Sequence, residues 1–135
     1  MTSNTQRTLK ALRAAGWTAE VVEKWIPYHG KNPQMLRAGG VRVDLFGFID
    51  IVAFKDNQIM AIQSTGQNFK AHDEKIKSID LALGWIQAGG ILELWGWRKV
   101  RDKSKPKAMK WDPRVYRYGT RDWVKAKDWL RELDL

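Results

Sequence analysis

Two short hydrophobic runs, separated by a polar segment, lie near the middle of the chain. The first run, Leu45–Phe54, is rich in β-branched and aromatic residues, and the second, Gln58–Thr65, is short and mostly apolar. Residues 55–57 between them are Lys, Asp and Asn, which are typical of a turn. The pattern therefore predicts two adjacent strands that form a β-hairpin within the stretch Val41–Asn68.

The segments before the hairpin predict a helix, a strand and a loop. A modest apolar stripe followed by a glycine predicts a helix over Thr5–Ala15. The run Trp17–Ile26 is rich in Trp, Val and Ile and is followed by a proline, which predicts a strand. Alternation along that strand would place Glu23 on its apolar side, whereas in the alternative, a helix, Glu23 would be solvated. Pro27–Gly40 is rich in Gly, Pro and polar residues and predicts a loop.

After the hairpin, the pattern predicts a long helix, a strand, a basic loop and a closing strand and helix. Asn68–Gln87 carries apolar residues at helical spacing, so we expect one helix with a buried stripe. Ile91–Val100 is expected to be a strand that joins the sheet in parallel and completes a β-α-β step. The remaining segments predict a basic loop over Arg98–Lys110, a short strand over Trp111–Gly119 and a helix over Thr120–Leu133.

These elements predict a single α/β domain over residues 1–135, with a mixed sheet of four or five strands flanked by helices. Its composition, with 44% hydrophobic and 29% charged residues, is typical of a folded protein with a core. The absence of cysteine excludes disulfides and cysteine-based zinc sites. No run approaches the length of a membrane span, so we expect a cytoplasmic protein that does not associate with a membrane.

A formal net charge of +9 favours an anionic partner, such as nucleic acid or an acidic membrane surface. The loops and the long helix supply candidate nucleic-acid contacts, although such residues can equally be solvated surface charges. The candidates are Lys31, Arg37, His72, Arg98, Lys99, Arg101, Lys103 and Lys105. The eight Trp residues are expected mainly to pack in the core and to cover the sheet rather than to stack on bases.

Candidate chemistry lies where polar residues interrupt the apolar hairpin, notably at Asp50, Gln63 and Thr65. A carboxylate in an apolar wall is costly unless a partner or a metal ion compensates it. If the turn lies near residues 56–57, Asp50 and Gln63 come level across the strand pair and can share one cation. Carboxylate and amide oxygens, completed by a main-chain carbonyl and waters, suit Mg²⁺. The hairpin therefore predicts a Mg²⁺ or Mn²⁺ site.

At these residues the chain resembles the PD-(D/E)XK nuclease superfamily, in particular its Holliday-junction-resolvase-like branch. The resemblance covers roughly Thr5–Val100 and follows the order helix, strand, acidic strand, short apolar strand, long helix, strand. Gly47–Ala53 resembles the Asp-bearing strand of the family, and Ala61–Thr65 takes the place of its second motif. The resemblance implies a restriction-endonuclease-like domain.

The resemblance also implies a function: a metal-dependent DNA endonuclease or junction resolvase, of phage or bacterial type, that hydrolyses phosphodiester bonds. In this family Asp50 would bind Mg²⁺ or Mn²⁺. The second motif is divergent, because Gln63 stands where the family has an acidic residue and Thr65 stands where it has Lys. Symmetric cleavage of both strands would call for a homodimer.

Other residues can compensate for the divergent motif. Lys75 or Lys70 on the following helix would supply the missing catalytic cation, and Glu23 or Asp44 would restore an acidic metal ligand. Asp44 also has a structural alternative, in which it caps a turn or pairs with a nearby arginine. The alternative function is a catalytically inactive nuclease-fold protein that binds nucleic acid, and a third is a protein-interaction module for an acidic partner.

Overall fold

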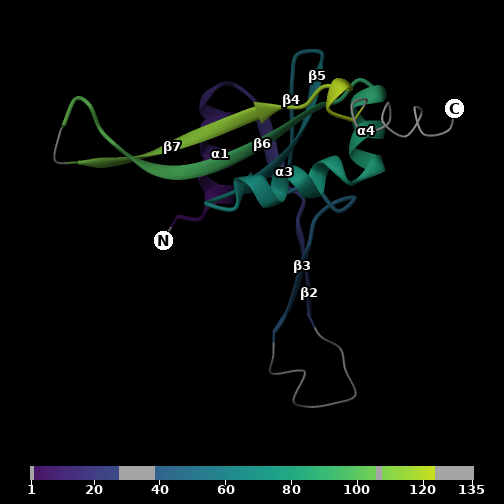
Figure 1. The fold of residues 1–135 in the computed structure, drawn as a ribbon, viewed down its shortest axis with the longest axis horizontal. Helices are drawn as coiled ribbons and strands as arrows, with labels where there is room; N and C mark the ends of the chain where they lie inside the picture. The colour runs from purple at the N-terminus through teal and green to yellow at the C-terminus, as the bar shows by residue number, and fades with distance from the viewer. Residues whose placement is uncertain (1, 28–38, 106–107, 124–135) are drawn as a thin grey trace, which may run out of the picture.

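The computed structural model describes residues 2–27, 39–105 and 108–123 (Figure 1). Five strands form a mixed sheet in the order β1-β4-β5-β6-β7, and β2 and β3 form a separate two-stranded ribbon. The β5–β6 pair is parallel and the other pairs of the sheet are antiparallel. The elements in chain order are α1 (Asn4–Ala14), β1 (Thr18–Val21), β2 (Lys24–Pro27), β3 (Gly40–Val43), β4 (Ile51–Lys55), β5 (Gln58–Thr65), α3 (Phe69–Lys77), α4 (Asp80–Gln87), β6 (Ile91–Arg101) and β7 (Met109–Arg117).

Helices cover both faces of the sheet, so the predicted α/β class and the mixed sheet flanked by helices are confirmed. On one face α1 buries Leu9 and Leu12 in a cluster that includes Ile62 of β5. On the other face α3 and α4 pack in a cluster that includes Ala61 of β5. Neighbouring residues of β5 thus point to opposite faces, as strand geometry requires. Within the described part of the chain, no helix combines the length and hydropathy that a membrane crossing requires.

The central hairpin is confirmed, although its first strand is shorter than predicted. β4 and β5 pair antiparallel from Ile51 opposite Ile62 to Lys55 opposite Gln58. Residues 45–49 do not belong to the strand but form a tight turn, closed by a bridge between Leu45 and Ile49. Two residues of this turn, Phe46 and Gly47, have positive φ angles, which are incompatible with a strand.

The strand predicted over Trp17–Ile26 is wrong as a single element, and so is the alternative of a helix. Residues 18–21 form β1 beside β4, whereas residues 24–27 form β2 and pair with β3 in the separate ribbon. The chain leaves the sheet after Val22, whose N–H donates to the carbonyl oxygen of Asp50, just before β4 begins. β3 follows the predicted loop, of which residues 28–38 lie outside the described residues.

The helix predicted over Asn68–Gln87 is divided into α3 and α4. Ile79 is extended (φ −100°, ψ 113°), and the Ser78 hydroxyl donates to the carbonyl oxygen of Lys75 at 2.6 Å. The predicted apolar stripe is nevertheless retained. Ile76 and Leu83 are buried, and Ile79 and Ile86 pack against the same cluster. The break therefore changes the direction of the backbone without changing which residues reach the core.

β6 joins β5 in parallel, which confirms the predicted β-α-β step. The basic loop predicted over Arg98–Lys110 is too long at both ends, because β6 continues to Arg101 and β7 begins at Met109. Nine residue pairs join the two strands, so the basic side chains project from a paired ribbon. The final strand predicted over Trp111–Gly119 is confirmed as β7. Of the closing helix predicted over Thr120–Leu133, residues 121–123 are helical, and the rest of the predicted range lies outside the described residues.

Thr8 of α1 connects the helix to two strands of the sheet. Its hydroxyl lies 3.0 Å from the Asn4 carbonyl oxygen, 2.9 Å from Ser64 Oγ and 2.7 Å from Trp97 Nε1. Because a carbonyl only accepts, the Thr8 proton goes to Asn4, and Thr8 Oγ accepts from the other two groups. The side chain of Thr8 is fully buried.

Thr8→Val is therefore expected to lower the free energy of unfolding by about 1–3 kcal/mol, because two buried donors lose their acceptor. Urea denaturation measures this change. Thr18→Val, at an exposed position of β1, is the matched control and should stay within about 0.5 kcal/mol of the wild type. Equal stability of the two variants would contradict the role assigned to Thr8.

Candidate metal site

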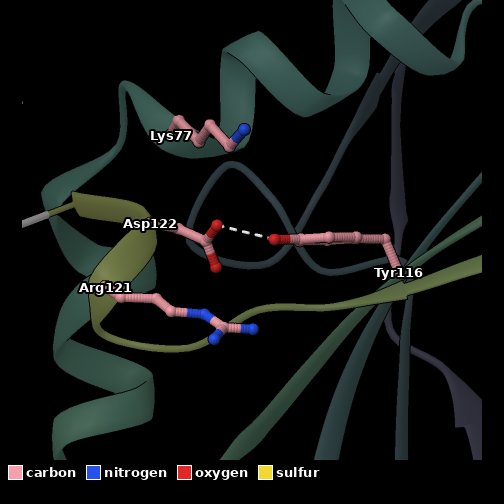
Figure 2. Close-up of a pocket in the computed structure, with 4 residues that line it drawn as sticks. All are labelled: Lys77, Tyr116, Arg121 and Asp122. Carbon is pink, nitrogen blue, oxygen red and sulfur yellow. Dashed lines mark hydrogen bonds between the residues drawn. The ribbon is translucent and has the colours of Figure 1, made fainter. Parts of the chain in front are cut away.

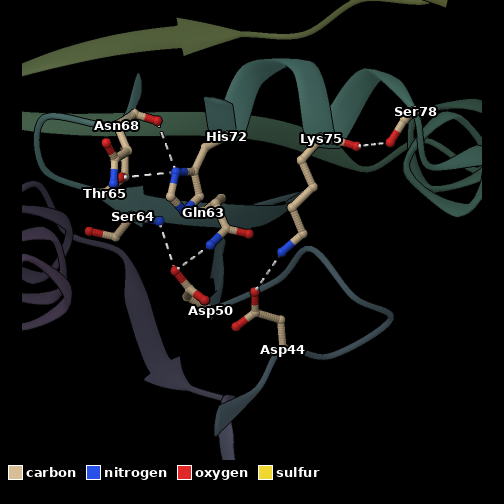
Figure 3. A network of polar contacts seen from close by, with 9 residues as sticks. All are labelled: Asp44, Asp50, Gln63, Ser64, Thr65, Asn68, His72, Lys75 and Ser78. Carbon is tan, nitrogen blue, oxygen red and sulfur yellow. Dashed lines mark hydrogen bonds and ion pairs between the residues drawn. The ribbon is translucent and has the colours of Figure 1, made fainter. Parts of the chain in front are cut away.

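Three carboxylates from different parts of the chain meet beside the end of β5. Figure 3 shows two of them, Asp44 and Asp50. The bridge between Leu45 and Ile49 folds residue 44 back toward residue 50. The hydrogen bond from Val22 N–H to the carbonyl oxygen of Asp50 holds the start of the ribbon at the same place. As a result, Glu23, Asp44 and Asp50 each offer a carboxylate oxygen within 4.8 Å of the others. We call these three residues the acidic cluster.

Asp50 is the buried member of the acidic cluster, with a relative exposure of 2%. Its Oδ2 accepts hydrogen bonds from the backbone N–H of Ser64 and from Gln63 Nε2, both at 2.9 Å. Neither Asp50 Oδ1 nor Gln63 Oε1, although both are buried, has a hydrogen-bond partner among the described residues. Buried oxygens are rarely left without a partner, so these two atoms are places where a cation would be favourable.

The electrostatics of the acidic cluster favour a proton or a metal ion. Burial above all, together with the neighbouring carboxyl groups of Asp44 and Glu23, raises the pKa of Asp50 to about 9, while the hydrogen bond from the N–H of Ser64 acts in the opposite direction. Without a metal ion, Asp50 is therefore protonated at neutral pH. A cation that binds here must displace that proton.

Two basic side chains lie at the rim of the acidic cluster. Lys75 Nζ of α3 is 3.7 Å from Asp44 Oδ2, and Arg42 Nη1 of β3 is 3.3 Å from Glu23 Oε1. Asp44 thus pairs with a lysine of α3, and Figure 3 shows this lysine extending from the helix toward the cluster. Of the two lysines predicted to supply a catalytic charge, Lys75 is the one that reaches the site. Lys70, on the same helix, makes no ion pair with a described residue.

Thr65 and His72 form a second polar contact at the end of β5. Thr65 Oγ1 lies 3.2 Å from His72 Nδ1, which is also 2.9 Å from the carbonyl oxygen of Asn68. Because the carbonyl of Asn68 can only accept, Nδ1 carries the proton and Nε2 is the free acceptor. His72, predicted as a nucleic-acid contact, therefore lies beside Thr65 and not among the basic residues of β6 and β7.

Of the other predicted nucleic-acid contacts, five lie on β6 or in the turn after it, and two lie outside the described residues. Residues 98, 99 and 101 are exposed on β6, and residues 103 and 105 lie in the turn that connects β6 to β7. Arg98 lies 4.0 Å from Asp112 on the opposite strand, which is a weak and exposed ion pair. Lys31 and Arg37 lie outside the described residues. The structure therefore brings the basic residues of the predicted loop together on one ribbon.

The geometry of Asp50 and Gln63 differs in one respect from the prediction. The two residues are level, as expected, but the amide nitrogen of Gln63 donates directly to Asp50 Oδ2, so only the other oxygen of each side chain remains for a cation. The sequence also gave no indication of Ser64 as a site residue. Its contact with Asp50 is made by the backbone N–H, which every residue other than proline carries.

A separate cleft of about 570 Å³ lies between α3 and the turn after β7 and is lined by Lys77, Tyr116, Arg121 and Asp122 (Figure 2). The Tyr116 hydroxyl donates to Asp122 Oδ1 at 2.7 Å, and the N–H of Gly119 donates to Asp122 Oδ2 at 2.8 Å. Both oxygens of the carboxylate are therefore engaged within the protein. We interpret this network as a structural anchor of the turn.

The acidic cluster is thus the group of side chains that could hold a metal ion in the described part of the chain. Comparisons of the chain with protein-family models, curated proteins and solved structures give no match. The chemistry of the site is therefore inferred from its residues.

Proposed function

We propose that the protein is a metal-dependent DNA endonuclease or junction resolvase, and that the acidic cluster holds its Mg²⁺ or Mn²⁺. The observation that carries the proposal is the meeting of three carboxylates within 4.8 Å, one of them on a residue that is 98% buried. Repulsion between like charges and desolvation of the buried one oppose folding, so this arrangement is costly unless a cation compensates it.

The donor atoms fit a hard divalent cation. Mg²⁺ and Mn²⁺ prefer oxygen ligands, and the acidic cluster offers only carboxylate oxygens, with the partnerless Oε1 of Gln63 nearby. Asp50, Asp44 and Glu23 would hold the ion. Such an ion, when bound, supplies Lewis-acid activation of a phosphate oxygen and a bound water of lowered pKa.

The remaining residues have distinct parts in this proposal. Ser64 and Gln63 fix the orientation of the Asp50 carboxylate through their hydrogen bonds. Lys75, beside Asp44 at the rim, provides the positive charge that would orient the attacking water or stabilise the charge that develops on phosphate. The exposed basic residues of β6 and of the turn between β6 and β7, which we call the basic ribbon, would hold the DNA backbone. Such contacts give affinity without sequence information.

The order of elements supports a PD-(D/E)XK assignment of this single domain. α1, β1, β4, β5, the α3–α4 pair and β6 follow one another as the resemblance requires, with the Asp-bearing residue at the start of the hairpin and β6 parallel to β5. The β2–β3 ribbon, inserted between β1 and β4, and the divided helix are departures from that order. A homodimer would follow if both strands are cut symmetrically.

A second candidate, binding of nucleic acid without cleavage, is favoured by one observation. Gln63 and Thr65 are neutral where the family has an acidic residue and Lys, and Gln63 already satisfies Asp50 Oδ2 without a metal ion. In that case the fold would hold nucleic acid through the basic residues of β6 and of the turn after it, while Asp50 remains protonated.

Cleavage of labelled duplex, nicked, flap and junction DNA, with Mg²⁺, with Mn²⁺ and with EDTA, tests the proposal. The wild type should give products only with a metal ion, and Asp50→Ala should lower the rate by about 1,000-fold or more because the buried ligand is lost. Glu74→Gln, which removes an exposed carboxylate of α3, is the matched control and should cleave normally. Salt-sensitive binding without products in any condition would reject catalysis and favour the second candidate.

A further inference from the structure

A cleft of about 610 Å³ lies where the start of α1, the segment after β5 and the β6–β7 ribbon meet. Its lining includes backbone, amide, aromatic and cationic groups, contributed by Asn4, Gly66, Gln67, Arg98, Lys99 and Trp111. Gly66 directly follows Thr65, the last residue of the strand whose Ser64 N–H holds Asp50. The cleft therefore lies just beyond the end of β5, two residues after Ser64, whose N–H holds Asp50 of the acidic cluster.

Trp111 is the aromatic element of this cleft, and it is held in place while 42% of it remains exposed. The guanidinium of Arg7 lies 3.6 Å from the centre of its ring, and Lys99 Nζ lies 5.2 Å from the same point. Arg7 is itself oriented by Asn4, whose Oδ1 accepts from Arg7 Nη1 at 2.9 Å. The guanidinium of Arg7 therefore lies over one face of the indole, and the part of the ring that remains exposed needs little ordering when a flat ligand binds it.

The glycine at the edge of the cleft keeps it open. A Cβ atom at position 66 would come within 2.9 Å of Asn4 Nδ2. The backbone after β5 thus lies close against the first residue of α1, and the amide nitrogen of Asn4 is available beside it. The cleft therefore combines an aromatic ring, side-chain amides and cations within a volume that suits one small ligand.

This combination is what an unpaired nucleotide requires. A base stacks on an aromatic face, amide groups can pair with its polar edge, and cations bind its phosphate. A base inside a continuous duplex has both faces covered by its neighbours, so only an unpaired base, or the base pair at the end of a duplex, can stack on an indole. We propose that this cleft binds an unpaired nucleotide, with its base against Trp111 and its phosphate near Arg98 and Lys99.

This inference rests on the proposed function, because it names the class of DNA that the proposed endonuclease would cleave. A nucleotide held beside the end of β5 would present the adjoining phosphate to the acidic cluster. The substrate would then be DNA that carries a single-stranded segment, as a flap, an overhang or an opened junction does, in preference to continuous duplex.

Binding in EDTA tests the cleft without requiring cleavage. The probes are fluorescently labelled ten-nucleotide oligothymidine and a ten-base-pair duplex, and fluorescence anisotropy gives their affinities. Trp111→Leu is expected to weaken binding of the single strand by about 10-fold or more and to leave duplex binding within about 3-fold. Trp111→Phe, which keeps an aromatic ring, should retain most of the single-strand affinity. Trp25→Leu removes another exposed Trp, on the β2–β3 ribbon, and should behave like the wild type.

Because binding is measured in EDTA, each outcome tests the cleft without depending on cleavage. Single-strand binding that is unchanged in Trp111→Leu, or equal loss of single-strand and duplex binding, would overturn the inference. Rescue by Trp111→Phe would support it and would exclude unfolding as the cause of the loss. If single-strand binding depends on Trp111 and yet no metal ion supports cleavage, the proposed endonuclease fails while the nucleotide cleft stands.

Discussion

Replacing Lys75 by Met is expected to slow metal-dependent cleavage by about 100-fold or more while leaving metal binding intact. Lys75 Nζ lies 3.7 Å from Asp44 Oδ2 and is the cation that α3 directs to the acidic cluster. Removal of a positive charge aimed at a developing negative charge typically costs catalysis two to three orders of magnitude. The same change removes a cation from beside the metal ion, so metal affinity should stay equal or become slightly tighter. Single-turnover cleavage at saturating Mg²⁺ measures the rate.

The matched control for this prediction is Lys70→Met. Lys70 is exposed on the same helix and makes no ion pair with a described residue, so its loss should change single-turnover cleavage by less than about 3-fold. Equal effects of the two substitutions would assign Lys75 to general DNA attraction. Loss of metal binding in Lys75→Met would contradict the separation of roles between this lysine and the carboxylates.

Metal affinity is expected to rise steeply with pH because of Asp50. Burial and the neighbouring carboxyl groups raise the pKa of Asp50 to about 9, so a metal ion must displace a proton at any lower pH. Each unit of pH below that value should weaken the apparent affinity by up to about tenfold, or about 100-fold between pH 8 and pH 6. Isothermal titration calorimetry with Mg²⁺, in buffers of different ionisation enthalpy, measures the affinity and counts the protons released.

The raised pKa of Asp50 also makes the free energy of unfolding of the metal-free protein depend on pH. Without metal, the folded protein keeps a proton on Asp50 between about pH 4 and pH 9 that the unfolded chain has already lost. The contribution of this group to the free energy of unfolding therefore falls as the pH rises through that window. A metal affinity that is constant between pH 6 and pH 8, with no proton released, would contradict the environment described for Asp50.

The part of the fold that local pattern determines could be predicted from the sequence. The two apolar runs and the polar turn between them predicted the hairpin, and the helical spacing of Ile76 and Leu83 predicted which face of the following segment is buried. These features depend on residues close together in the chain. The prediction that Asp50 and Gln63 come level also succeeded, because the turn sets the register of a hairpin.

The features that depend on long-range pairing could not be predicted. β2 and β3 pair across a connection of more than ten residues, and no periodicity in either strand indicates its partner. The β2–β3 ribbon positions two members of the acidic cluster, because Glu23 directly precedes β2 and Asp44 directly follows β3. The sequence therefore indicated both acids as candidate ligands, whereas their meeting with Asp50 follows from the fold.

The basic ribbon illustrates how composition can mislead about structure. A segment with several Lys and Arg residues is typical of a solvated loop, yet Arg101 still belongs to β6, a strand of 11 residues that begins at Ile91. The pairing of β6 with β7 satisfies the backbone, so the charged side chains can project from a regular strand without being buried. The same pairing places Trp111 opposite Lys99, which a loop would not have done.

Binding of Mn²⁺ to the wild type and to Asp50→Asn at pH 8, followed by electron paramagnetic resonance of the free ion, tests the central claim most directly. Asn is nearly isosteric with Asp and can still accept the hydrogen bond from Ser64, so circular dichroism should show both proteins folded. The acidic cluster predicts one saturable Mn²⁺ site per chain in the wild type, weakened by about 100-fold or more in the variant. Absence of saturable binding, or equal binding by the two proteins, would contradict the assignment of the cluster as a metal site.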